Sequence, residues 1–216
     1  MIEKGRSITF EGHDGTGKST QINMLGERLK DQYGIESLVI HEPDGPGISA
    51  AIREIIKNGN LPRDAITNLL LFTASRHESN ALGEAALEEG TWVLRARDYS
   101  STEAYQGGGE GLDPAYIRKV TEEFTTPGYM NPDLKVILSL PHENRIDRIA
   151  SRGELERPDT FEMRGHDFQQ RVNDTYVEIA ARDSLPVIEA SGTIDDVHQE
   201  LMELIWLRGL LSRHHS

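Results

Sequence analysis

The chain has 216 residues, of which 37% are hydrophobic and 27% charged, so it is long enough to bury the core of one domain. Its 36 acidic residues outnumber 23 lysines and arginines, and the resulting formal charge of −13 excludes a general nucleic-acid binder, which needs a cationic face. The absence of cysteine excludes disulfides and thiolate metal sites, and no apolar run reaches signal-peptide or membrane-spanning length. We expect a cytoplasmic protein that binds neither nucleic acid nor membranes.

Short apolar runs alternate with longer segments of helical period, a pattern typical of a sheet with helices on both faces. We therefore predict one doubly wound α/β domain over 1–216, built on a parallel five-stranded sheet. The predicted strands are Ser7–Phe10, Ser37–Ile40, Trp92–Leu94, Lys135–Leu140 and Pro186–Glu189. The predicted helices are Lys18–Gln32, Ser49–Lys57, Arg63–Glu89, Pro114–Thr125, Glu143–Arg152, Gly165–Asp183 and Thr193–Leu211. Loops rich in glycine, proline or charge are predicted at 41–47, 105–114 and 152–162.

The stretch after the first strand, GHDGTGKS (12–19), matches the pattern G-x-x-x-x-G-K-[ST] between a strand and a helix. Glycines let successive backbone N–H groups point at an anion, and the helix N-terminus adds partial positive charge. We expect Lys18 to contact the β- and γ-phosphates of a nucleoside triphosphate and Ser19 to ligate Mg²⁺. The alternative, a chance glycine-rich turn, fits the strand–helix context less well. The predicted nucleotide-binding residues are Gly12, His13, Asp14, Gly15, Thr16, Gly17, Lys18, Ser19 and Thr20.

Phosphate-binding loops of this kind occur in switches, motors and kinases, and the rest of the sequence distinguishes these classes. The guanine-reading pattern [NT]-K-x-D of GTPases does not occur in the sequence. A motor ATPase needs a metal-side carboxylate where the third strand ends, but the chain reads Arg95-Ala96-Arg97 there, and it is small. Phosphoryl transfer to a small acceptor is therefore the better interpretation.

Four later segments carry a resemblance to one family. They are HEPDGPGISAAIRE (41–54), LLLFTASR (69–76), ARDYSSTEAYQGGGEGL (96–112) and NPDLKVILSL (131–140). In order and separation they resemble bacterial thymidylate kinase, and the similarity continues into RIASRG (148–153). The resemblance implies a homodimer that transfers the γ-phosphoryl of ATP to dTMP, with Mg²⁺, giving dTDP and ADP for dTTP biosynthesis.

The resemblance also assigns an acceptor site. Phe72 would stack on thymine and Arg76 would hydrogen-bond the base edge, although each alone would be interpreted as helix core or a solvated charge. Arg53 and Arg97 would hold the acceptor phosphate through their planar guanidinium groups. The substrate-binding residues implied are Asp14, Glu42, Pro43, Arg53, Phe72, Arg76, Arg97, Ser101, Thr102, Tyr105 and Gln106, with Asp14 and Tyr105 facing the deoxyribose and Ser101, Thr102 and Gln106 the base.

Three positions depart from the family pattern. Ala96 stands where the family has an aspartate near the metal, and Asp98 is the carboxylate that follows it. Asp44 adds negative charge to the loop after the second strand, where it would oppose a phosphate unless it points away or caps the next helix. Thr160 replaces an arginine of the family's lid, which we place at about residues 141–164.

Other lid arginines are available to take over that role, namely Arg148, Arg152, Arg157 and Arg164. We hypothesise that Arg152 or Arg157 closes over the transferring phosphoryl, so the predicted catalytic residues are Lys18, Arg53, Arg97, Arg152 and Arg157. The competing interpretation is that the lid arginines form solvated pairs with Glu154 and Glu156. Two other functions also stay open: a kinase for another nucleoside monophosphate or a deoxynucleoside, and a nucleotide-binding regulator that has lost catalysis.

Overall fold

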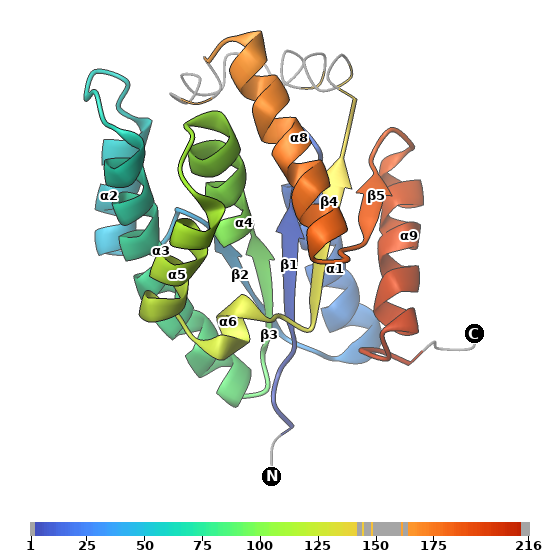
Figure 1. The fold of residues 1–216 in the computed structure, drawn as a ribbon. Helices are drawn as coiled ribbons and strands as arrows, with labels where there is room; N and C mark the ends of the chain where they lie inside the picture. The colour runs from blue at the N-terminus through green and yellow to red at the C-terminus, as the bar shows by residue number, and fades with distance from the viewer. Residues whose placement is uncertain (1–2, 142–143, 145–147, 149–160, 162–163, 213–216) are drawn as a thin grey trace.

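Five parallel strands form the centre of the protein, in the order β2-β3-β1-β4-β5 (Figure 1). The structure, a computed structural model, describes residues 3–141, 144, 148, 161 and 164–212. The predicted parallel five-stranded sheet is confirmed, with bounds within about two residues of those expected from the sequence. The strands are β1 (Ser7–Glu11), β2 (Ser37–His41), β3 (Trp92–Ala96), β4 (Leu134–Ser139) and β5 (Val187–Glu189).

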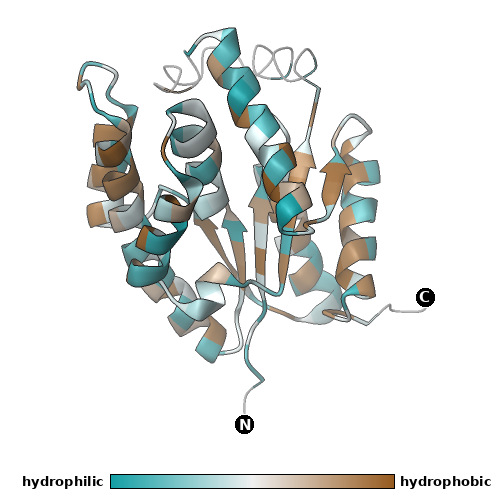
Figure 2. Cartoon of the chain, viewed as in Figure 1, coloured by the Kyte–Doolittle hydropathy of each residue, from teal (hydrophilic) through white to brown (hydrophobic). Residues whose placement is uncertain are grey.

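Helices cover both faces of the sheet, so the strands lie in a dry layer and read as continuous apolar runs (Figures 1 and 2). One face packs on α1 (Lys18–Tyr33) and α9 (Ile194–Leu207), whose buried Leu25 and Leu201 belong to the same core cluster as Phe10 and Val136. The helices of the other face are α2 (Ile48–Lys57), α3 (Ala65–Glu88), α4 (Tyr99–Thr102), α5 (Pro114–Phe124), α6 (Pro127–Met130) and α8 (His166–Arg182). Among the described residues, no helix has the length and low charge needed to cross a lipid bilayer.

The glycine-rich segment predicted as a loop at 105–114 is mostly helical, so that prediction is wrong. Asp98 caps α4 by accepting a hydrogen bond from the Ser100 N–H at 2.7 Å, and α4 continues into the π-helical turn η1 (Glu103–Gly109). The glycines there let η1 lie directly against α8, because a Cβ at Gly108 would stand 1.8 Å from the hydroxyl of Thr175. Tertiary packing therefore overrides the low helical propensity of glycine.

The end of α9 and the helix α6 also differ from the sequence-based expectation, and one predicted helix cannot be compared. Helix α9 ends at Leu207 rather than Leu211, since Gly209 adopts the left-handed conformation that stops a helix (φ 68°). The short helix α6 was not predicted, because a four-residue segment carries no periodicity. The predicted helix 143–152 lies mostly outside the described residues, as does most of the predicted lid.

Candidate active site

The phosphate-binding loop joins β1 to α1, as predicted. Gly12, Gly15 and Gly17 have φ values of 127°, 85° and 93°, a region that favours glycine. A Cβ on Gly12 would lie 2.2 Å from the carbonyl oxygen of Leu138, so the loop also needs glycine to pass close to β4. The Lys18 ammonium donates to the carbonyls of Gly12 and His13, both at 2.8 Å, which holds the side chain across the loop. The loop therefore has the curled form that phosphate binding requires.

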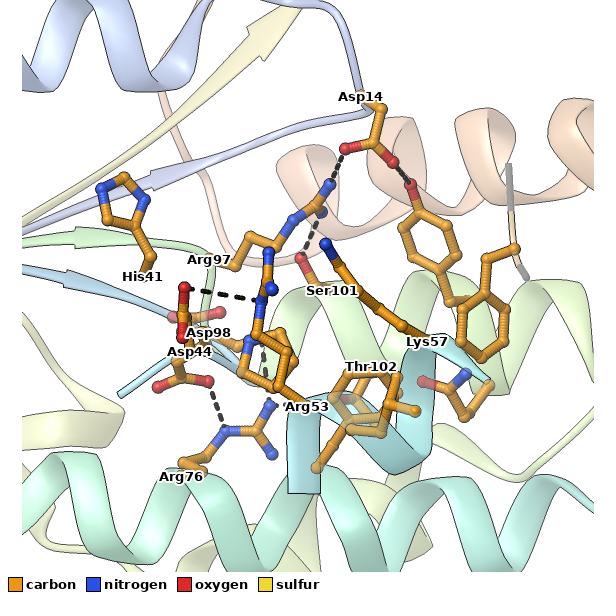
Figure 3. Close-up of a pocket in the computed structure, with 17 residues that line it drawn as sticks. Asp14, His41, Asp44, Arg53, Lys57, Arg76, Arg97, Asp98, Ser101 and Thr102 are labelled. Carbon is orange, nitrogen blue, oxygen red and sulfur yellow. Dashed lines mark hydrogen bonds and ion pairs between the residues drawn. The ribbon is translucent and has the colours of Figure 1, made fainter. Parts of the chain in front are cut away.

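Beside this loop lies a cavity of about 310 Å³ (Figure 3). Every substrate-binding residue predicted from the sequence lines it, so the structure brings together side chains from the phosphate-binding loop, α2, α3 and the segments after β2 and β3. Their individual roles remain predictions. Sequence reasoning did not find His41, Ile56, Lys57 and Phe161 in this lining. A signal for Lys57 was present, because it stands four residues after Arg53 on one helix.

Arg97 is held at the junction between this cavity and the phosphate-binding loop. Its guanidinium contacts the carboxylate of Asp14 and donates to the Ser101 hydroxyl at 2.9 Å (Figure 3). The Tyr105 hydroxyl donates to the other oxygen of Asp14 at 2.9 Å. Burial would raise the pKa of Asp14, but Arg97 and Lys18 outweigh it and lower that pKa, so Asp14 is ionised. Arg97 has φ 75°, a strained backbone for a side chain of its size, which the surrounding contacts maintain.

Arg76 is fully buried at the back of the cavity. Its Nε donates to Glu42 at 2.9 Å and its Nη2 to the Thr102 hydroxyl at 3.0 Å, while the Tyr129 hydroxyl donates to the other Glu42 oxygen at 2.9 Å. Burial raises the pKa of Glu42, although Arg76 opposes the shift. The Nη1 of Arg76 has no hydrogen-bond partner among the described residues, although it is buried. An unsatisfied buried donor at a cavity wall is costly unless a ligand accepts from it.

Under the cavity lies a buried group of charges that the sequence did not reveal. Glu11 accepts hydrogen bonds from the backbone N–H of Asp98 at 2.6 Å, the Ser101 hydroxyl at 2.8 Å and the Tyr176 hydroxyl at 3.0 Å. The Lys135 ammonium lies 2.5 Å from the Asp98 carboxylate. Burial, and then the neighbouring Asp98, raise the pKa of Glu11 to about 7. This group ties β1 and β4 to the segment that carries Arg97 and Ser101.

A family model described as thymidylate kinase matches residues 10–201. The chain belongs to the thymidylate kinase family. Its relatives include the thymidylate kinase of Afipia carboxidovorans, 39% identical and matched over 93% of this chain and 88% of that protein. The thymidylate kinase of Cupriavidus necator is 35% identical, with coverage of 94% and 98%. The crystal structure of thymidylate kinase from Ehrlichia chaffeensis superposes with a TM-score of 0.76 at 26% identity, covering 94% of this chain and 99% of that one.

Ala96, which stands where the family has an aspartate, lies at the end of β3 beside the phosphate-binding loop. Ala96 pairs in register with Phe10 and His41, and it lines a second cavity with Asp14, Ser19 and Glu42 at the phosphate-binding loop. Asp98 does not line that second cavity, and its carboxylate is bound by Lys135. Among the described residues, the carboxylates that line this second cavity are therefore those of Asp14 and Glu42.

The structure also resolves how Asp44 is placed. It does not cap α2, since the residue at that position is Gly47 and no side chain in the described part of the chain caps the helix. Instead, the Asp44 carboxylate pairs with the Nε of Arg53 at 3.4 Å (Figure 3). The capping alternative is wrong, and the negative charge of Asp44 lies beside a predicted phosphate ligand.

Of the lid arginines, only Arg148 and Arg164 lie within the described residues. The Arg148 guanidinium donates to the carbonyl of Ala190 at 2.6 Å, and that of Arg164 pairs with Glu110 at 2.8 Å. Arg152, Arg157 and Thr160 lie outside the described residues, so their predicted roles stay predictions.

Proposed function

We propose that this thymidylate kinase transfers the γ-phosphoryl of ATP to the 5′-phosphate of dTMP, giving dTDP and ADP. The observation that carries the proposal is the meeting of two cavities: the one at the phosphate-binding loop and the larger one share Asp14, His41, Glu42 and Arg97 as lining residues. A donor phosphate in the first and an acceptor in the second would meet at Asp14 and Arg97. Direct transfer needs this adjacency, because the reacting atoms must approach within about 3–3.5 Å.

On the acceptor side, the buried Arg76 supports recognition of a base. Its Nη1 would donate to the thymine edge, and the half-buried ring of Phe72 would stack on its face. Tyr105, fixed through its hydroxyl to Asp14, would crowd the position of a ribose 2′-hydroxyl and so favour a deoxynucleotide. Arg53 and Arg97 would hold the 5′-phosphate, and Gln106 and Thr102 would face the base.

On the donor side, the amides of the loop and the ammonium of Lys18 would bind the phosphates of ATP. Ser19 is exposed in the first turn of α1 and lines the loop cavity with the carboxylates of Asp14 and Glu42, an oxygen donor set that fits Mg²⁺. We infer that Ser19 would hold Mg²⁺, which when bound neutralises phosphate charge. Arg152 or Arg157 would add positive charge from the lid.

No general base is required in this scheme. The attacking oxygen belongs to a phosphate that is already anionic, so catalysis depends on positioning two anions and neutralising their charge. Lys18, Arg53 and Arg97 are the described residues that would do this.

The test is ADP release in a coupled assay with dTMP, dUMP, dCMP, dGMP and thymidine as acceptors. We expect release with dTMP to exceed that with each of the other four. Faster turnover of another monophosphate or of thymidine would favour a related kinase, and no release with any acceptor would favour a nucleotide-binding regulator. The role of the lid arginines is tested by the turnover of Arg152→Ala and Arg157→Ala. If both variants turn over as fast as the wild type, neither arginine acts on the transferring phosphoryl.

We further propose that the enzyme is a homodimer, as the family resemblance implies, and that it is cytoplasmic. Large apolar side chains are exposed along α2 and α3, where Ile48 is 61% and Leu70 is 54% exposed. Large exposed apolar side chains gathered on neighbouring helices would suit an interface. Light scattering should give twice the chain mass for the wild type and a smaller mass for Leu70→Lys, and a monomeric wild type would refute the dimer.

A further inference from the structure

The side chain of Glu110 lies just outside the acceptor cavity, where three side chains donate to its carboxylate. The Gln106 carboxamide nitrogen donates to Oε2 at 3.2 Å, and the Asn68 carboxamide nitrogen lies 3.2 Å from both oxygens. The Arg164 guanidinium pairs with Oε1 at 2.8 Å. The Glu110 side chain is only 6% exposed, so these three donors take the place of water around the carboxylate.

The donors and acceptors of this group determine how its two carboxamides are turned. Arg63 has only donors, and its Nε lies 3.1 Å from Asn68, so the oxygen of Asn68 faces Arg63 and its nitrogen faces Glu110. The Glu110 carboxylate, paired with a guanidinium, only accepts hydrogen bonds. The atom of Gln106 that faces it must therefore be the nitrogen, and the carboxamide oxygen is the atom left for a ligand.

The contacts around Glu110 also keep this arrangement in place. The backbone carbonyl of Gln106 accepts from the N–H of Leu112 at 2.9 Å, which fixes the chain on both sides of Glu110. The guanidinium of Arg164 lies over the ring of Phe168, 4.7 Å from its centroid, and so holds the other side of the carboxylate. A side chain held by packing and hydrogen bonds on both sides can position its neighbour accurately.

The orientation of the carboxamide matters because Gln106 is buried and lines the acceptor cavity. Thymine carries a hydrogen on N3, a donor that a carboxamide oxygen facing the cavity would accept. Cytosine has no hydrogen on N3, so the same oxygen would face another acceptor, and leaving two buried acceptors without a hydrogen between them is costly. A carboxamide turned the other way would present its nitrogen and match cytosine instead.

We propose that Glu110 is a positioning residue for base recognition, which holds the Gln106 carboxamide with its oxygen towards the base and thereby favours thymine and uracil over cytosine. The proposal rests on the function proposed above and deepens it, because it names a residue outside the cavity that sets the choice of pyrimidine. Glu110 touches no substrate in this scheme and acts only through Gln106.

The test measures the affinities of the full-length Glu110→Gln variant for dTMP, dUMP and dCMP by isothermal titration, with dCMP in competition against dTMP. A carboxamide at position 110 can either accept from Gln106 or donate to it, so the Gln106 side chain can turn either way. The ratio of dTMP to dCMP affinity should therefore fall about tenfold. The ratio of dTMP to dUMP affinity should stay within about twofold of that of the wild type, because uracil presents the same hydrogen-bonding edge as thymine.

Two control variants separate the carboxamide from the ion pair and from the substitution itself. Arg164→Met removes the ion pair but keeps the carboxylate, so the ratio of dTMP to dCMP affinity should not change. Glu122→Gln makes the same chemical change at an exposed position of α5 outside the cavity, and should change no affinity. Melting curves identify a folding defect in Glu110→Gln, and in that case Glu110→Gln/Arg164→Gln, which leaves no guanidinium without its partner, replaces it.

Three results would overturn the proposal. An unchanged ratio of dTMP to dCMP affinity in Glu110→Gln would show that Glu110 does not set the orientation. An equal loss of affinity for all three nucleotides would assign Glu110 a structural role only. A fall of the ratio in Arg164→Met as large as in Glu110→Gln would make selectivity depend on the ion pair.

A double-mutant cycle with Gln106→Ala tests whether Glu110 acts through Gln106. Gln106→Ala should itself reduce the ratio of dTMP to dCMP affinity, and Glu110→Gln should reduce it no further in that background. A further fall of similar size would overturn the proposal. Because titration needs no turnover, failure of the proposed function is separately visible, as wild-type protein that prefers dTMP to dCMP in binding but releases no ADP with it. Wild-type protein without that preference would overturn both.

Discussion

The buried ion pair between Lys135 and Asp98, beneath the acceptor cavity, gives the sharpest stability prediction. The substitution Lys135→Met tests it. The Lys135 side chain is 6% exposed and that of Asp98 only 1%, and their charged atoms lie 2.5 Å apart. Glu11, which is fully buried, approaches the same segment through its hydrogen bond to the Asp98 backbone. Methionine has nearly the length of lysine, so the substitution removes the charge with little change in packing.

The expected loss of stability comes from leaving the buried Asp98 carboxylate without its partner. Breaking a buried ion pair by removing one member costs about 3–5 kcal/mol, because the remaining carboxylate cannot be solvated. For a chain of this length each kcal/mol lowers the melting temperature by about 2–4 °C. We therefore expect Lys135→Met to melt about 6–20 °C below the wild type.

Chemical denaturation at about pH 7.5 measures the free energy directly, with Asp98→Asn/Lys135→Met as the control. The double variant removes both charges and should recover most of the loss, since paired replacement of a buried ion pair is often nearly neutral. A single variant within about 1 kcal/mol of the wild type would refute the reasoning, because it would mean that the pair is effectively solvated. A double variant no more stable than the single one would show that packing, and not charge, accounts for the loss.

Three further outcomes follow from the same structure. Burial raises the pKa of Glu11 from its ordinary value of 4.5 to about 7. Between these two pH values the folded protein keeps a proton on Glu11 that the unfolded chain loses, so the free energy of unfolding of the wild type falls as the pH rises through this range. Glu11→Gln removes this titration. Between about pH 4 and about pH 8, the free energy of unfolding of the variant should therefore rise by about 3 kcal/mol relative to that of the wild type. An equal pH dependence of unfolding in both proteins would contradict the raised pKa. Arg97→Lys keeps the charge but loses the forked contacts to Asp14 and Ser101, so kcat/KM for dTMP should fall about 10²–10³-fold in the coupled assay. Gly108→Ala places a methyl against α8 and should lower the unfolding free energy by about 1–3 kcal/mol; an unchanged melting temperature would contradict the close packing.

The parts of this molecule that could be predicted from sequence are those with local signals. Strands that are buried on both faces read as short apolar runs, and all five were found. The loop at residues 12–19 has a fixed spacing and a fixed strand–helix context, so its conformation followed. The acceptor residues were located only through the order of motifs, because Phe72 or Arg76 alone has nothing local that separates a ligand contact from helix core or surface.

The contacts that could not be predicted are those between residues far apart in the chain. Lys135 and Asp98 meet because β4 and the end of β3 flank β1, and neither residue has a local pattern that indicates a buried ion pair. The glycine run at 107–109 was read as loop because glycine lowers helix propensity, but its close approach to α8 is visible only in three dimensions. Likewise, the pairing of Asp44 with Arg53 depends on how the β2–α2 loop folds.

Among the described residues, four cations line the acceptor cavity, and their contacts divide them into two kinds. Arg76 is fully buried with its guanidinium bound to Glu42 and Thr102, and Arg97 is held by Asp14 and Ser101 on a strained backbone. Arg53 and Lys57 come instead from a half-exposed helix face and carry flexible side chains. Ordering a long flexible side chain costs up to about 2 kcal/mol, a cost that the fold has already met for Arg76 and Arg97. We therefore expect the two arginines fixed within the fold to set the position of the acceptor nucleotide, and the flexible side chains of α2 to adjust to it.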